Sequence, residues 1–259
     1  MLSRNNIKYI NSLSQKKYRQ QYRQFIAEGD KIIKELLHTD GYTIQWLIAT
    51  KDWLDKMPEE QLEKPESLIE VKETEMERIS QLKTPNQVLA VVNIPRQQEP
   101  PDSLQNSLCL AFESIRNPGN LGTIMRIADW FGIPAIYCSG DSADLYNPKV
   151  IQATMGSFIR VKPYYTDLQN LISNYKEPSR LYATVLHGSD IYQKKLSNKG
   201  IVFFGNESSG LSKELEGMID NKIAIPSFQR ASQGAESLNL SVSAGIICSE
   251  FRRQNHYSK

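Results

Sequence analysis

Cysteine is scarce in this sequence, and the few cysteines are not arranged to bind a metal. The 259 residues contain three, Cys109, Cys138 and Cys248, each inside an apolar run and far from the others. Cysteine pairs two residues apart and cysteine–histidine clusters are missing, which argues against a zinc site. We therefore expect no metal, and we expect three reduced thiols in the core.

Long apolar runs and phosphate-binding loops are missing as well. No stretch approaches the ~20 apolar residues of a membrane-spanning helix, and the first residues lack the apolar core of a signal peptide. This pattern predicts a cytoplasmic protein. Neither GxGxxG after the first strand of the second domain nor Gly-Lys-Ser/Thr occurs, so a nucleotide-dependent enzyme of the ordinary doubly wound class lacks its signature.

Acidic residues are missing from the first segment. The net charge is only +2, yet residues 1–27 contain six basic residues and no acidic one. The spacing predicts one helix over residues 6–27, with Lys16, Arg19 and Arg23 on one face. Such a face either binds an anionic partner or is simply solvated.

Alternating strands and helices predict a small α/β domain before residue 95. Three prolines between residues 95 and 101 then interrupt the pattern, and we place a linker there. The predicted boundaries are 1–94 for the first domain, 95–106 for the linker and 107–259 for the second domain. The expected elements of the first domain are helices at 31–37, 52–56 and 73–82, and strands at 45–49, 67–71 and 88–93.

The second domain has short apolar strands that alternate with helices, which is typical of a parallel sheet covered on both faces. Ligands bind outside the carboxyl ends of the strands in such sheets. The expected strands are 108–112, 133–138, 157–161, 180–186, 201–204 and 222–225. The expected helices, besides the one that follows the first strand, are 148–155, 166–174, 211–217 and 237–252.

Three loops of this domain carry candidate functional residues. In the first, the strand 108–112 ends at Asn-Pro-Gly-Asn and a helix begins, with Asn120 placed to cap it. Arg126 falls off the apolar face of that helix, which we expect to comprise Leu121, Ile124, Ala128 and Phe131.

The second and third loops follow later strands. The second, within residues 201–215, is glycine-rich and carries Glu207, and its glycines allow a ligand to lie against the backbone. The third follows Pro226 and reaches Ser237-Leu238-Asn239 at a helix start. This helix carries small and apolar residues on nearly all of its sides, which fits either a helix in the core or a helix in a dimer contact.

Together the loops read N-P-G-N-L-G-T-I-x-R-x-A-D-x-F-G, F-G-N-E-x-x-G-L, and I-P with E-S-L-N-L-S-V-S-A-G-I. They resemble the three motifs of the SpoU/TrmH family of SPOUT RNA methyltransferases, in that family's order. The first domain, with KYINSLSQKKYRQQ and IAEGDKIIKELL, resembles the ribosomal-protein-like substrate-binding domain of many members.

This resemblance implies an S-adenosyl-L-methionine-dependent enzyme that methylates a ribose 2′-hydroxyl of structured RNA. It also implies a homodimer and an α/β domain whose parallel sheet ends in a deep trefoil knot. The two-domain form favours ribosomal RNA. The alternatives are a transfer RNA 2′-O-methyltransferase and a catalytically weak RNA-binding module of the same fold.

The resemblance also assigns residues. The implied catalytic residues are Arg126, Asn120, Glu207, Ser237 and Asn239. The implied cofactor-binding residues are Thr184, Leu186, Gly205, Asn206, Ile225 and Leu238. The expected RNA-binding residues, from charge and position, are Lys16, Arg19, Arg23 and Arg230, the last in a loop over residues 227–236 that is longer than in typical members or simply a surface insertion.

Arg126 is the residue to which the family's activation of the 2′-hydroxyl is assigned. Its guanidinium either loses a proton in a desolvated pocket or stabilises the developing alkoxide and a nearby phosphate. We favour the second role because the pKa of a guanidinium lies above ~12. Glu207 is expected to fix either Arg126 or the loop by charge-assisted hydrogen bonds.

Overall fold

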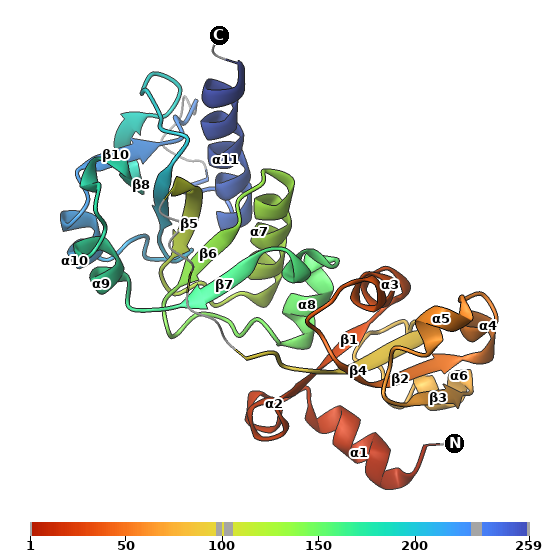
Figure 1. Ribbon diagram of the computed structural model, residues 1–259. Helices are drawn as coiled ribbons and strands as arrows, with labels where there is room; N and C mark the ends of the chain where they lie inside the picture. The colour runs from red at the N-terminus through yellow and green to blue at the C-terminus, as the bar shows by residue number, and fades with distance from the viewer. Residues whose placement is uncertain (1, 97–99, 101–105, 229–234, 258–259) are drawn as a thin grey trace. The chain divides into compact units, whose positions relative to one another are not determined.

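The computed structural model describes residues 2–96, 100, 106–228 and 235–257 (Figure 1). The chain divides into two compact units. The first comprises residues 1–98 and 144–159, and the second comprises residues 99–143 and 160–259. In the described part of the chain, none of the helices has the length and hydropathy that a membrane crossing requires.

The first unit is built on a four-stranded sheet with the order β1-β4-β2-β3. Strand β4 is antiparallel to β1 and β2, while β3 is parallel to β2. Apolar residues of α1 and α6 pack on one face of this sheet. The elements are α1 (Arg4–Ser12), α2 (Lys16–Tyr22), β1 (Gln24–Glu28), α3 (Asp30–His38), β2 (Ile44–Thr50), α4 (Lys51–Leu54), α5 (Glu59–Leu62), β3 (Leu68–Val71), α6 (Glu73–Met76) and β4 (Val88–Asn93).

The single helix predicted over residues 6–27 is wrong. Helix α1 ends at Ser12 and α2 ends at Tyr22, followed by Arg23, which adopts a left-handed φ of 52°. The chain then enters β1, whose five residues are all buried and pair with β4. A run such as Phe25-Ile26-Ala27 is apolar toward both faces, which a sheet covered on both sides accommodates and a helix with one apolar face does not.

Residues 144–159 complete the first unit, although sequence reasoning assigned them to the second domain. They include α8 (Pro148–Thr154) and the short 3₁₀ helix η2 (Ser157–Ile159). The ring of Phe25 on β1 lies 4.8 Å from that of Tyr146 and 6.0 Å from that of Phe158, centroid to centroid. This segment therefore packs aromatic side chains against β1, an edge strand of the first sheet.

The second unit contains a parallel six-stranded sheet with the order β10-β8-β9-β5-β6-β7. The predicted α/β class with a parallel sheet is confirmed. The strands are β5 (Leu108–Phe112), β6 (Ala135–Cys138), β7 (Lys162–Tyr165), β8 (Leu181–Asp190), β9 (Gly200–Phe204) and β10 (Asn221–Ala224). The strand expected at 157–161 is displaced to β7, because residues 157–159 form η2 instead.

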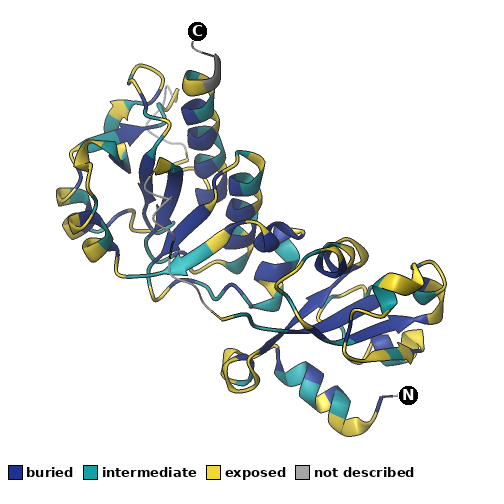
Figure 2. Ribbon diagram, in the orientation of Figure 1, coloured by how far each residue is buried: buried dark blue, intermediate teal, exposed yellow. Residues whose placement is uncertain are grey.

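Helices cover both faces of this sheet, as Figure 1 shows. On one face, α9 (Leu168–Ser173) and α10 (Lys213–Gly217) share a hydrophobic cluster with the strands. On the other lie α7 (Pro118–Trp130) and α11 (Leu240–Tyr257), side by side. Another 3₁₀ helix, η3 (Pro178–Arg180), leads into β8. Figure 2 draws the central strands as buried.

The three cysteines are buried and free, as predicted. Cys109 lies on β5, Cys138 on β6 and Cys248 on α11. Burial raises the pKa of each thiol to about 12. The thiols are therefore protonated at neutral pH and behave as small apolar side chains.

Candidate functional site

Hydrogen bonds join one side chain from each of the three motif loops. The Asn239 Nδ2 donates to Asn120 Oδ1 at 3.2 Å, and Asn120 Nδ2 donates to Glu207 Oε1 at 2.9 Å. Asn120 lies on α7, Glu207 follows β9 and Asn239 precedes α11. The structure thus assembles at one place three residues that are 87 and 119 positions apart.

The loop after β9 is closed by its own backbone. Asn206 and Gly210 exchange two backbone hydrogen bonds, both 3.0 Å long. A Cβ on Gly205 would lie 1.9 Å from the carbonyl carbon of Gly210. Glycine at 205 is therefore required by this closure. The ligand contact expected for Gly205 is a separate, untested prediction.

A polar network behind this loop holds it in place, and sequence reasoning missed it. The Asn206 Nδ2 donates to the carbonyl oxygen of Ser114 at 2.8 Å. Ser114 has a left-handed φ of 54°, which is unusual for a residue with a side chain. Its N–H donates to Ser139 Oγ at 2.7 Å, and its Oγ donates to Asp141 Oδ2 at 2.5 Å. The strain at Ser114 is thus compensated by hydrogen bonds from both backbone and side chain.

The carboxylate of Asp141 is stabilised in its charged form. Hydrogen bonds from Ser114 and Ser139 hold the pKa of this carboxyl below its usual range. The signal in the sequence was the run Ser139-Gly-Asp141-Ser at the carboxyl end of a buried strand. Polar residues at that position of a parallel sheet indicate a site or its support.

Asn117, not Asn120, caps α7. Its Oδ1 accepts from the N–H groups of Gly119 at 2.8 Å and Asn120 at 3.3 Å. The prediction that Asn120 is the cap is wrong, because the helix already begins at Pro118. The side chain of Asn120 is thereby available to bridge Glu207 and Asn239.

Arg126 is exposed on α7, as its place off the apolar face predicts. Leu121, Ile124 and Ala128 are buried, whereas Phe131 is only half-buried. Within the described residues, Arg126 has no ion-pair partner, and Glu207 accepts from Asn120 and Asn206 rather than from it. Glu207 is thus bonded to α7 and to its own loop, its pairing with Arg126 is absent from this structure, and its functional role stays a prediction.

Asn239 caps α11. Its Oδ1 accepts from the N–H of Ser241 at 2.9 Å and from the Ser241 hydroxyl at 2.6 Å. The helix begins at Leu240, three residues later than predicted, so Ser237 lies before it and is exposed. The helix is not buried on all sides, because Val242 is 50% exposed.

The candidate cofactor residues lie on or after three adjacent strands, β10, β8 and β9, except Leu238, which precedes α11. The ladder between β8 and β10 passes from the pair Lys222 and Ala183 to the pair Ile223 and Ser189. Residues 184–188 therefore leave the ladder and direct backbone groups away from the sheet. Thr184 and Leu186 belong to this excursion, and Ile225 directly follows β10.

Apolar side chains at this edge are unusually exposed. Leu186 is 71% exposed and Leu238 is 50% exposed, although both are large and apolar. Exposed apolar side chains of this kind fit a ligand with an apolar ring, such as an adenosyl group. The residues present are thus compatible with the cofactor that the resemblance implies.

These motifs are matched in a known family. Residues 107–249 match the SpoU rRNA Methylase family, and residues 4–90 match the MRM3-like substrate binding domain. The chain belongs to the SpoU rRNA methylase family. The resemblance read from the three motifs is confirmed.

Relatives of this SpoU chain match it over nearly its full length. The 23S rRNA (guanosine(2553)-2′-O)-methyltransferase RlmP of Bacillus subtilis (strain 168) is 26% identical over 95% of each chain. The structure of a putative RNA methyltransferase of the TrmH family from Porphyromonas gingivalis has a TM-score of 0.86 and 33% identity, covering 98% of this chain and 99% of that one. The structure of an AdoMet-bound rRNA methyltransferase from Sinorhizobium meliloti has a TM-score of 0.82 and 29% identity, and the match covers 98% of this chain and 97% of that one.

The basic residues predicted to bind RNA do not share one surface in this SpoU family member. Lys16 and Arg23 are exposed, but Arg19 is only 2% exposed. Its guanidinium lies 2.6 Å from Asp144 and also donates to the carbonyl oxygens of Leu13 and Ser14. The prediction that Arg19 contacts RNA is therefore wrong, since its donors are engaged inside the first unit. Arg230 lies outside the described residues.

The buried pair of Arg19 and Asp144 gives a prediction for stability. We expect Asp144→Ala to lower the free energy of unfolding by about 1–3 kcal/mol, because a buried charged donor loses its anionic partner while keeping two carbonyl acceptors. Thermal unfolding measures this loss. Asp40→Ala, which removes an exposed carboxylate from the same unit, is the control and should be neutral. Equal melting temperatures for both variants would contradict the prediction.

Proposed function

We propose that this protein is an S-adenosyl-L-methionine-dependent RNA methyltransferase that methylates a ribose 2′-hydroxyl, with ribosomal RNA as its substrate. The observation that carries the proposal is the hydrogen-bonded chain from Asn239 through Asn120 to Glu207, one residue from each family motif. The relative from Bacillus subtilis, named a 23S rRNA 2′-O-methyltransferase, supports the same substrate class.

Cofactor binding is proposed for the edge formed by β10, β8 and β9. Bound there, S-adenosyl-L-methionine supplies a methyl group activated by a neighbouring sulfonium. Leu186 and Leu238 would cover its apolar parts, and backbone groups of Thr184, Gly205, Asn206 and Ile225 would bind its polar edges. The closed loop of residues 205–211 provides a rigid wall for this site, and such preorganisation favours near-attack geometry.

Methyl transfer would form a bond between the ribose oxygen and the methyl carbon while the bond of that carbon to the donor sulfur breaks, and the hydroxyl proton would pass to solvent water. We assign to Arg126 the stabilisation of the negative charge that develops on this oxygen, because a guanidinium remains protonated. Glu207 and Asn239 orient Asn120, which in turn fixes the first turn of α7. We expect Ser237, exposed just before α11, to contact the RNA or the cofactor.

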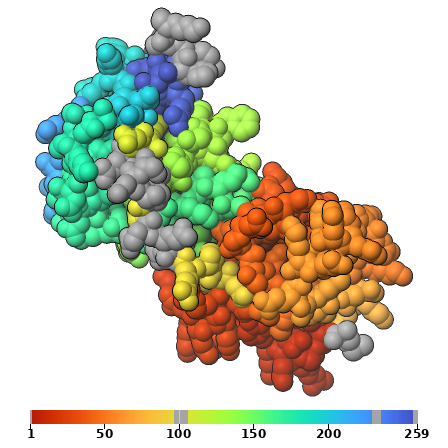
Figure 3. All heavy atoms as spheres, in the orientation of Figure 1, coloured from red at the N-terminus to blue at the C-terminus, as the bar shows by residue number. Residues whose placement is uncertain are grey.

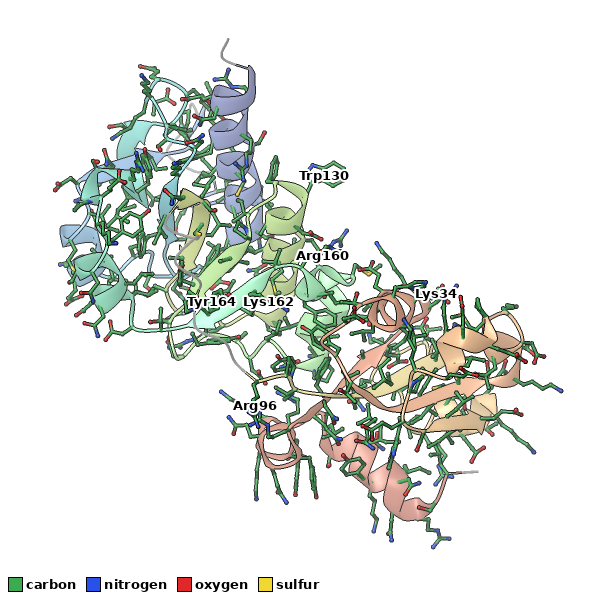
Figure 4. All side chains as sticks on the ribbon, in the orientation of Figure 1. Lys34, Arg96, Trp130, Arg160, Lys162 and Tyr164 are labelled. Atoms are coloured by element: carbon green, nitrogen blue, oxygen red, sulfur yellow. The ribbon has the colours of Figure 1, made fainter. Side chains whose placement is uncertain are left out.

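The remaining properties of the proposal concern assembly and location. We propose a homodimer, supported by the exposed Trp130 and Val242 on the neighbouring helices α7 and α11. Figure 4 shows Trp130 pointing away from its own unit. The deep knot of the second unit stays a prediction. We place the activity in the cytoplasm with its RNA substrate.

The test is transfer of a labelled methyl group from S-adenosyl-L-methionine to RNA from cells that lack this protein. The expected product is one 2′-O-methylated nucleotide in ribosomal RNA, located by resistance of the adjacent linkage to alkaline cleavage. A mark in transfer RNA would replace the proposed substrate. Cofactor binding without transfer to any RNA, or no cofactor binding at all, would overturn the proposal and favour an RNA-binding module.

A further inference from the structure

Four aromatic rings form a continuous row in the first unit. The ring of Trp46 on β2 lies 5.3 Å from that of Tyr9 on α1, and Tyr9 lies 5.0 Å from Tyr22 on α2. Tyr18 is the fourth ring, nearly parallel to Tyr22 at 13° and 6.2 Å away. The row begins at the sheet and ends on the surface, where Tyr22 is 42% exposed.

The inner part of this row is held rigidly. The Tyr9 hydroxyl donates to the side chain of Gln24, whose amide donates to Asn93 Oδ1 at 2.7 Å. Burial, with a smaller contribution from Tyr22, raises the pKa of Tyr9 above its ordinary value. The ring therefore carries no negative charge at neutral pH. An exposed aromatic surface on a fixed base loses little conformational entropy when a flat ligand stacks on it.

Positive charge surrounds the exposed end of the row. Lys16, Lys17 and Arg23 are exposed on or beside α2, and the Lys17 ammonium lies 5.6 Å from the centre of the Tyr18 ring. The Arg23 carbonyl accepts from the N–H of Ile94 at 2.7 Å, which brings the exposed Arg96 near the same end of α2 (Figure 4). Figure 3 shows this red N-terminal segment at the surface of its unit.

Acidic residues are missing from the whole of residues 1–27. Flat, neutral rings framed by cations fit unpaired bases whose phosphates lie on either side. A paired RNA helix does not fit equally well, because its bases are stacked inside and its recognition depends on phosphate and 2′-hydroxyl groups. An apolar protein partner fits less well, because the surface is ringed by charge.

We infer that Tyr22 and Tyr18 form a stacking platform for unpaired bases of RNA, with Lys16, Lys17 and Arg23 binding the adjacent phosphates. This inference rests on the proposed function, because it names the part of the RNA substrate that the first unit recognises. The substrate then presents a loop or a single-stranded segment to the first unit. The platform acts in binding and takes no part in the methyl transfer itself.

The test measures RNA affinity of the full chain by fluorescence anisotropy over a range of salt concentrations. The probes are a single strand of about 12 uridines and an RNA duplex of the same length. We expect Tyr18→Leu/Tyr22→Leu to weaken single-strand binding by about 5- to 100-fold, the range for loss of base stacking, with an unchanged salt slope. Duplex binding should remain within twofold.

A second variant removes the positive charges and keeps the tyrosines, so that the contribution of charge is measured separately from that of stacking. For each phosphate that the variant no longer neutralises, Lys16→Gln/Arg23→Gln should lower the salt slope by ~0.7 with the single strand and by ~0.9 with the duplex. Tyr192→Leu is the matched control, because Tyr192 is 48% exposed in the other unit. It should bind both probes like the wild type. Ultraviolet cross-linking of the wild type to the uridine strand should place the adduct on Tyr22 or Tyr18.

Either of two binding results would overturn the platform. One is unchanged single-strand affinity in a folded Tyr18→Leu/Tyr22→Leu variant, and the other is an equal loss for strand and duplex. If that variant fails to fold, the cross-linking experiment decides. A wild-type protein that cross-links to the uridine strand only at residues outside α2 would also overturn the platform. The proposed function fails separately, by absence of methyl transfer, which this binding assay does not measure.

Discussion

Replacing Arg126 with alanine should abolish most methyl transfer while leaving cofactor binding intact. We expect kcat to fall by about 10²- to 10³-fold, the loss typical of removing one donor that stabilises developing charge. The side chain is exposed and pairs with no described residue, so the fold has no reason to change. Single-turnover transfer of labelled methyl to the RNA identified above measures the rate, and calorimetry measures the cofactor affinity.

Arg180→Ala is the matched control for this change. Arg180 precedes β8 at the amino edge of the sheet, opposite the candidate site, and its guanidinium pairs with Glu177 at 2.8 Å. Its loss should leave kcat unchanged. An Arg126→Ala enzyme with wild-type kcat would remove Arg126 from the chemistry and leave the stabilisation of the developing negative charge to another group.

The second large effect is expected for Gly205→Ala. The added Cβ would lie 1.9 Å from the carbonyl carbon of Gly210 and 2.0 Å from the N–H nitrogen of Leu211. Both atoms are backbone and cannot rotate away, so the loop must open. We expect a loss of about 3 kcal/mol in the free energy of unfolding, at the upper end of overpacking costs. Cofactor affinity should fall at least about tenfold, since 1.4 kcal/mol of lost binding suffices for that.

Gly217→Ala separates this clash from a general effect of adding a methyl group. Gly217 ends α10 in the same unit, and a Cβ there would meet nothing within 4 Å. Alanine should be neutral or slightly stabilising at that position, because it restricts the unfolded chain. Thermal unfolding and cofactor titration of both variants provide the comparison, and equal behaviour would contradict the closed-loop explanation.

Residues that repeat with a clear period were predictable from the sequence. The strand Leu108–Phe112 was placed correctly and the existence of the helix after it was predicted, because a short apolar run and a polar Pro-Gly loop define them locally. The motif residues Asn120, Glu207 and Asn239 were singled out from the sequence as catalytic, a role that stays a prediction. Their mutual hydrogen bonds were not predicted, since they depend on how distant loops meet in space.

The mistakes came where tertiary contacts override local pattern. Basic residues at helical spacing predicted one exposed face, yet Arg19 is buried because Asp144, 125 residues away, offers it a partner. Asn120 was predicted to cap α7, but Asn117 is the cap because the helix begins at Pro118. Ser114 and Asp141 were overlooked, because a strained backbone and a hydrogen-bond network across two loops produce no repeating pattern of residues in the sequence.

The segment 144–159 has a consequence for how this protein is made. During translation the first ~98 residues are synthesised long before Asp144 and Phe158. Arg19 and Phe25 therefore cannot form their contacts with these residues until more than half of the chain has been synthesised. The amino-terminal unit therefore matures late, although domains usually fold in the order of synthesis. A truncation after residue 98, or a chimera joined there, would carry an unfinished unit, whereas a chimera that also exchanges residues 144–159 would transfer it whole.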